Sequence, residues 1–128
     1  MNSEKYIRML DEELLPISRS LGGENWIFQQ DNAAIHVSKK CKEWFSSKNV
    51  NLLSHPARSP DLNPIENLWS TLSRKVYEDG QFDSVEELKK TIIKCWNLIE
   101  DEECQKLITS MKNRICQVLI NKGGSTTY

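Results

Sequence analysis

Residues 59–69 (SPDLNPIENLW) constrain the chain more than any other stretch. Two prolines bracket a turn, and Asn63 is a good N-cap for a helix that starts at Pro64, where the missing N–H costs nothing. Glu66 then lies in the first turn of that helix. The spacing from Asn63 to Glu66 leaves two interpretations open. The Glu66 carboxylate either folds back on the Asn63 N–H in a capping-box variant, or it points away from the N-terminus of the helix toward a second acidic residue.

A candidate for that second acidic residue lies upstream, directly after a short apolar-leaning run at residues 26–30 (WIFQQ). Asp31 follows this run, and an aspartate at the carboxyl end of a strand lies where open α/β sheets place their sites. Thirty-four residues separate Asp31 from Glu66. A spaced pair of acids is by itself a weak signal. Taken alone, a plain turn residue before Asn32 is the simpler interpretation of Asp31.

Apolar periodicity predicts a chain of helices with two short strands and a turn. The predicted helices span residues 2–20, 38–47, 64–77, 85–98 and 100–120, the strands residues 26–30 and 50–53, and the turn residues 79–81. Asn2 or Ser3 could cap the first helix, and Pro16 should kink it or end its regular part. Ser38 and Ser84 are placed to cap two later helices. Because strand, helix and strand follow within 28 residues, the two strands should be parallel.

Composition bounds the class of protein. The 128 residues suffice for one domain with a hydrophobic core. The chain has 17 Lys and Arg residues against 18 Asp and Glu residues, so it lacks the net positive charge that would indicate nucleic-acid binding. No apolar run approaches the roughly 18 residues of a membrane span, and no signal peptide is evident. We therefore expect a soluble intracellular protein with no membrane association.

The tryptophans and some of the cysteines lie on apolar helix faces. Trp44, Trp69 and Trp96 are expected in the core, with base-stacking platforms as the second interpretation. Cys41 and Cys104 are expected to be buried free thiols, because the four cysteines form no C-x-x-C pair and show no zinc-ligand spacing with histidine.

The segment QQDNAAIH at residues 29–36, followed after that gap by SPDLNPIENLW, resembles the catalytic domain of Tc/mariner transposases of the DDE type. The likeness extends through nearly the whole chain, to Arg114, residues 122–124 and Tyr128. It implies an α/β fold, a partial ribonuclease-H-like fold with short parallel strands flanked by helices. Residues 1–124 would be the C-terminal portion of the catalytic domain, and residues 125–128 a loose tail.

The resemblance also implies the site. Asp31 and Glu66 would be the second and third of three acids that bind two divalent metal ions, Mg²⁺ or Mn²⁺, and their carboxylates should converge. The first acid of the family lies on an earlier strand that the chain does not contain, and Asp11 sits in the wrong context, inside a helix. Weak metal binding and no activity of the chain alone are therefore expected. Further residues could line the site or contact DNA, with ordinary structural roles as the alternative: Asn32, His36, Arg58, Ser59 and Asn63.

The implied function is metal-dependent cleavage and strand transfer of DNA in transposition and integration. Transposon ends and target DNA would be the partners, in the nucleus if the protein acts in a eukaryote. The alternative is a non-catalytic, transposon-derived remnant that binds at most nucleic acid or protein. In the family's strand order the strand at 26–30 pairs with the strand at 50–53 on one side. Its other edge would be open here, so self-association through this edge is expected.

Overall fold

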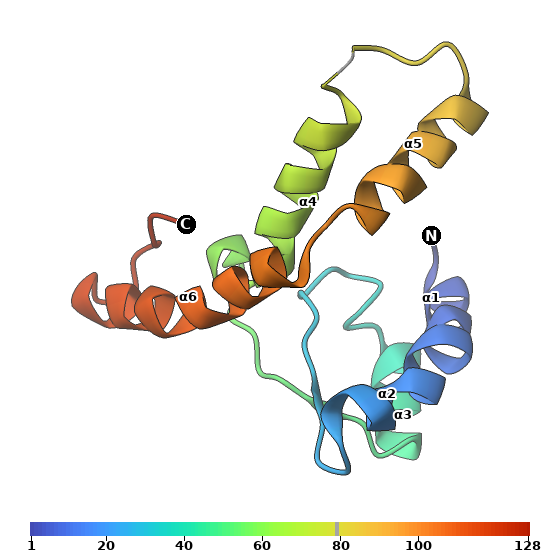
Figure 1. Cartoon of the computed structure of the whole chain (residues 1–128). Coiled ribbons are helices and arrows are strands. Elements are labelled where there is room, and N and C mark those ends of the chain that lie inside the picture. Colours follow the sequence, from blue (N-terminus) through green and yellow to red (C-terminus); the bar gives the residue numbers. More distant parts are fainter. Residues whose placement is uncertain (79) are drawn as a thin grey trace. The chain divides into compact units, whose positions relative to one another are not determined.

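The computed structural model describes residues 1–78 and 80–128, which form two compact units, Met1–Arg58 and Ser59–Tyr128 (Figure 1). Asp79, the first residue of the predicted turn at 79–81, lies outside the described residues. Among the described helices, none is both long enough and apolar enough to cross a membrane.

The first unit opens with one continuous helical rod of three segments: α1 (Ser3–Met9), the π-helical η1 (Leu10–Leu14) and α2 (Leu15–Gly22). Asn2 caps α1, because its side chain accepts a hydrogen bond from the Lys5 N–H at 2.9 Å. Pro16 is the second residue of α2. The wider π turn before it accommodates a residue that has no N–H to donate. Regular helix does not end at Pro16, because α2 continues to Gly22, and the irregular turn lies before it, in η1.

A βαβ unit follows, made of β1 (Ile27–Phe28), α3 (Lys39–Ser47) and β2 (Asn51–Leu52). The two strands are parallel, with Ile27 opposite Asn51 and Phe28 opposite Leu52, as the sequence predicts. Both are shorter than predicted, although the Leu53 N–H still donates to the Phe28 carbonyl at 2.8 Å.

The core of the first unit lies between the helical rod and α3. Its buried members are Tyr6, Leu10, Cys41, Trp44, Phe45 and Val50. Cys41 and Trp44 are therefore buried as predicted. Asp11 lies at the edge of this core, where it accepts a hydrogen bond from Trp44 Nε1 and pairs with Lys48, both at 3.0 Å. Asp11 thus has a structural role, in agreement with its omission from the predicted site.

The second unit is helical. It contains the 3₁₀ turn η2 (Pro60–Leu62), α4 (Pro64–Val76), α5 (Val85–Asn97) and α6 (Asp101–Ile120). Helix α4 packs against both α5 and α6, and α6 also contacts η2 (Figure 1). Ser84 caps α5 by accepting from the Glu87 N–H at 3.1 Å, as predicted. A small core of Leu72, Val76 and Cys95 joins α4 to α5.

Some residues predicted to be in the core of this unit are exposed. Trp69 and Trp96 are 47% and 43% exposed, and they stack on each other across α4 and α5 with ring centroids 5.5 Å apart. Cys104 is half-buried rather than buried. On α6, the apolar residues Ile108, Ile115 and Leu119 are also exposed, and the one buried residue among those described in this helix is Arg114. Helical periodicity correctly predicts which helix faces are apolar. In this unit, few neighbouring elements cover those faces.

Candidate functional site

Asp31 follows the carboxyl end of β1, and a tight turn holds its carboxylate. Oδ1 accepts a hydrogen bond from the Ala33 N–H at 3.0 Å and lies 2.6 Å from His36 Nδ1. The side chain is 54% exposed. These bonds hold Asp31 by one oxygen atom, so its second oxygen, Oδ2, can face solvent or a ligand.

The turn also sets the charge of Asp31. The Ala33 N–H is the largest cause of a lowered pKa at Asp31, partial burial opposes it, and His36 adds to the lowering through its hydrogen bond and its charge. His55 contributes a smaller electrostatic lowering of the same pKa. Asp31 therefore stays ionised below the usual range of an aspartate, which is the state that a metal ligand needs.

A second layer of contacts holds His36 in place. The imidazole lies against the Tyr6 ring, with centroids 4.3 Å apart, and the Tyr6 hydroxyl donates to Gln30 Oε1 at 2.6 Å. Gln30 Nε2 in turn lies 3.4 Å from the His36 carbonyl oxygen. Burial, with smaller contributions from Cys41 and Asp31, raises the pKa of Tyr6 to about 12, so the phenol remains a donor at neutral pH. Tyr6 was missed as a support of the site, because its sequence signal is only that of a core position.

Asn32 ties the two strand ends together. Its side-chain Nδ2 donates to the carbonyl oxygen of His55 at 2.8 Å, and His55 lies just beyond β2. The loops after both parallel strands are thereby fixed at one end of the sheet, where α/β folds place their sites. The predicted residues Asp31, Asn32 and His36 are thus brought together in the first unit.

Glu66 lies in the first turn of α4, as predicted, and its side chain is exposed. The capping-box interpretation is wrong, because the Asn63 N–H donates to the Pro60 carbonyl at 2.9 Å. Asn63 instead reaches Glu66 through its side chain, with Nδ2 at 3.5 Å from Glu66 Oε1. Asn63 itself is buried and makes no side-chain cap to α4. The carboxylate is therefore held loosely by one long contact.

The remaining predicted residues lie at the junction of the two units. Arg58 ends the first unit, is exposed and has a left-handed backbone with φ 56°. Ser59 begins the second unit and accepts the Leu62 N–H through its carbonyl at 3.1 Å. Since Asp31 and Glu66 belong to different units, the convergence of their carboxylates stays a prediction. Within each unit, no group of three or more His, Cys, Asp or Glu side chains among the described residues is arranged to hold a metal ion.

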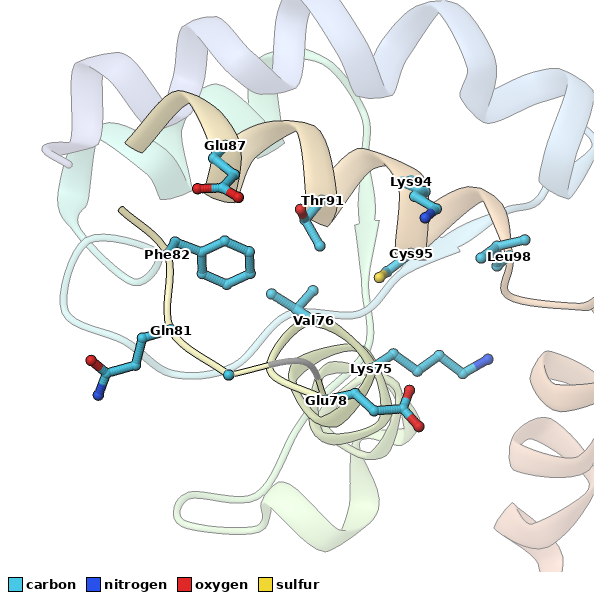
Figure 2. Close-up of a pocket in the computed structure, with 11 residues that line it drawn as sticks. Lys75, Val76, Glu78, Gln81, Phe82, Glu87, Thr91, Lys94, Cys95 and Leu98 are labelled. Atoms are coloured by element: carbon cyan, nitrogen blue, oxygen red, sulfur yellow. The ribbon is translucent and has the colours of Figure 1, made fainter. Parts of the chain in front are cut away.

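The hollows of the second unit include two along α4. A pocket of about 490 Å³ between α4 and α5 is lined by Val76, Phe82, Cys95 and several charged side chains, and no predicted site residue lines it (Figure 2). A shallower hollow runs along α4 and includes Glu66 itself, with Trp69, Ser70, Ser73, Arg74 and Tyr77. The second hollow places three hydroxyl groups and a guanidinium beside Glu66.

Comparison with known proteins gives the class. A family model described as DDE superfamily endonuclease matches residues 1–89. The Tc3 transposase of Caenorhabditis elegans is 42% identical over 100% of this chain and 39% of its own length. The Tc1 transposase of the same organism is 34% identical over 99% of this chain and 46% of its own length.

Solved structures agree. A structure of the Mos1 transposase catalytic domain with raltegravir and Mn superposes with a TM-score of 0.86 at 23% identity, covering 98% of this chain and 66% of that chain. A Mos1 paired-end complex with the left transposon end gives 0.84 at 25% identity, covering 97% of this chain and 37% of that chain.

The chain belongs to the DDE superfamily endonucleases. More closely, it corresponds to part of the catalytic domain of a Tc/mariner transposase and has the ribonuclease-H-like fold of that domain. The family and the fold that the motifs at 29–36 and 59–69 imply are thus confirmed. The chain spans less than half the length of the curated transposases reported above.

Proposed function

We propose that this chain supplies two carboxylates, Asp31 and Glu66, to a site that cleaves and joins DNA with Mg²⁺ or Mn²⁺. The observation that carries the proposal is the arrangement of Asp31. It lies at the end of a parallel strand and is held through Oδ1, and its lowered pKa keeps it ionised. Such a group is oriented before a ligand arrives.

The residues fit a hard divalent cation. Mg²⁺ prefers carboxylate oxygens and keeps several waters, so a partly exposed aspartate and an exposed glutamate suit it better than buried groups would. When bound, a pair of such ions clamps the attacking and leaving oxygens of an in-line displacement at phosphorus. The protein's own share is to orient the acids: His36 and the Ala33 N–H hold Asp31, and the start of α4 presents Glu66.

DNA is the proposed substrate and partner. Arg58, Ser59 and Asn63 precede Glu66 in one loop, and Ser70, Ser73 and Arg74 follow it along α4. Arginine, serine and asparagine side chains are common phosphate contacts, which position a duplex without reading its sequence. The solved Mos1 complexes contain a transposon end, which supports the same class of partner here. If the protein acts in a eukaryote, this substrate places it in the nucleus.

A calorimetric titration with Mn²⁺ tests the metal site. The purified 128-residue chain should bind Mn²⁺ weakly, and Asp31→Asn and Glu66→Gln should each abolish the heat of binding. Glu13→Gln is the matched control, because Glu13 is an exposed acid on the helical rod outside the proposed site. Equal binding by all four proteins would refute the assignment of both carboxylates.

Activity of the chain by itself is expected to be absent. The implied mechanism needs a third acid, and among the described residues of each unit no three His, Cys, Asp or Glu side chains are arranged to hold a metal ion. Incubation with transposon-end DNA and Mg²⁺ should therefore yield no nicked product. Robust nicking that Glu66→Gln abolishes would contradict this expectation and would show that two acids suffice.

We also propose self-association through the sheet. Among the described residues β1 pairs with β2 alone, so its outer edge presents unpaired backbone groups, and Ile27 is 61% exposed there. Light scattering after size exclusion should find dimers or larger species, and Ile27→Lys should shift them toward monomer. A wild-type monomer at high concentration would exclude this proposal.

A further inference from the structure

Arg114 is the most enclosed charged residue of the second unit. It lies on α6, is 0% exposed, and donates through Nε to Ser110 Oγ at 2.8 Å. Its Nη1 donates to the Asp61 carbonyl at 2.7 Å and to Asn67 Oδ1 at 2.8 Å. Among the described residues its buried Nη2 has no hydrogen-bond partner. Burying a guanidinium is costly, so this one must organise the groups that it contacts.

The C-terminal residues close over the same arginine. The Tyr128 ring lies beneath the guanidinium, with its centroid 4.4 Å from Cζ. The Thr126 N–H donates to Asp61 Oδ2 at 2.7 Å, and the Thr127 N–H donates to Gln117 Oε1 at 3.0 Å. Asp61 is thus held from two sides, by Arg114 at its carbonyl and by the tail at its carboxylate.

Asp61 and Asn67 bracket Glu66 along the chain. One lies in η2, directly before α4, and the other follows Glu66 in the first turn of α4. Within the described part of the chain, the Glu66 carboxylate has a single contact of its own, at 3.5 Å to Asn63. Its direction must therefore come from the segment that carries it. Arg114 holds this segment through the Asp61 carbonyl before Glu66 and through the Asn67 side chain after it.

We propose that Arg114, Thr126 and Tyr128 form a latch that positions Glu66. These are positioning residues: they act through Asp61 and Asn67 and contact neither metal nor DNA. The inference rests on the proposed role of Glu66 as a metal ligand. It extends that role by assigning the chain's last residues to the site, although they are far from it in sequence.

The test uses Tyr128→Ala in the 128-residue chain, with Tyr128→Phe as the matched control that keeps the ring on Arg114. Backbone ¹⁵N order parameters are measured for residues 61–67 and, as an internal reference, for Leu72 and Val76. In Tyr128→Ala the values at 61–67 should fall from about 0.85 to below about 0.6, while the reference residues stay rigid. Tyr128→Phe should match the wild type. Unchanged values at 61–67, or an equal loss along all of α4, would overturn the latch.

A Mn²⁺ titration of the same proteins separates the latch from the metal site. Loss of an outer-shell support typically weakens metal binding about 10–100-fold, and Tyr128→Ala should weaken it by at least the lower figure. Undiminished affinity with a loosened loop would overturn the positioning role. If the wild type binds no Mn²⁺, the proposed function fails, and the order parameters alone decide whether the latch exists. Arg114→Lys gives a second variant, which keeps the charge but loses the planar fork and should loosen residues 61–67 in the same way.

Discussion

The two proposed carboxylates are held by opposite means. Asp31 is fixed at its own side chain, by the Ala33 N–H and by His36, on a loop that the side chains themselves tie down. Among the described residues Glu66 makes one long side-chain contact, and the buried Arg114 holds the segment around it through the Asp61 carbonyl and the Asn67 side chain. Asp31 is therefore oriented by contacts to its own carboxylate, whereas Glu66 is oriented by the segment that carries it.

This difference predicts what the loss of a contact changes around each carboxylate. Contacts to Asp31 are at the surface, so their loss should change protonation and orientation with little change in stability. Contacts near Glu66 pass through a fully buried guanidinium, so their loss should change stability first. The comparison can be tested by breaking one contact at a time.

The largest effect is expected from Arg114→Ala. The change leaves the Asp61 carbonyl, Asn67 Oδ1 and Ser110 Oγ without their donor in a buried region, where each unsatisfied group costs about 1–3 kcal/mol. The free energy of unfolding should fall by about 3 kcal/mol or more, measured by urea denaturation. The matched change Arg74→Ala, on the exposed face of α4, should cost less than about 0.5 kcal/mol. Similar losses in both variants would remove the distinction between the two regions.

A smaller effect is expected in the first unit from Tyr6→Phe. The ring that packs on His36 is retained, and only the hydrogen bond to Gln30 Oε1 is lost. The free energy of unfolding should fall by about 1 kcal/mol, since the partner amide oxygen is half-buried. Urea denaturation measures the change, and Tyr77→Phe, at an exposed tyrosine, is the control. A loss as large as that of Arg114→Ala would show that the Asp31 region also depends on a buried anchor.

Much of this organisation is readable from sequence because it is local. The N-caps at Asn2, Ser38 and Ser84 and the start of α4 at Pro64 all follow from residues a few positions apart. Asp31 at a strand end and Glu66 in a first helical turn were placed by the same local rules. These are features in which short-range chemistry decides the outcome.

The long-range contacts could not be predicted. Arg114 joins residues 47 and 53 positions away, and nothing in its helical spacing distinguishes it from a solvated arginine. Trp69 and Trp96 show the converse, because apolar spacing predicted burial and their main partner is each other. Periodicity tells which face is apolar, and the tertiary neighbours decide whether it is covered.

A still smaller effect on stability, with a clear effect on protonation, is expected from His36→Ala. The pKa of Asp31 should rise, because the histidine lowers it, yet it should stay below the ordinary value, because the Ala33 N–H is the larger cause. Titration of the carboxyl carbons by NMR measures this change. Full recovery of an ordinary pKa would show that the histidine alone holds the charge. Stability should change by less than about 1 kcal/mol, as for other exposed pairs.

The smallest effect is the pH dependence that Asp31 and Asp61 share. The Asp61 pKa is lowered chiefly by the Thr126 N–H, as the Asp31 pKa is by the Ala33 N–H. A depressed folded-state pKa stabilises the fold above the unfolded value of about 3.9, and this stabilisation is lost as the pH falls through the folded value. The free energy of unfolding should therefore hold level from pH 7 to about 5 and fall below about pH 4.

Asp31→Asn and Asp61→Asn should each make that acid-side decline shallower in urea denaturation at a series of pH values. Neither should abolish it, because the pKa values of Glu4 and Asp11 are lowered as well, in the first case by Lys40 and in the second by Lys48. If the tail holds Asp61 as described, deleting residues 126–128 should reproduce the shallower decline of Asp61→Asn while Asp31 titrates as before. A deletion that alters the titration of Asp31 would mean that the two carboxylate regions are not held independently.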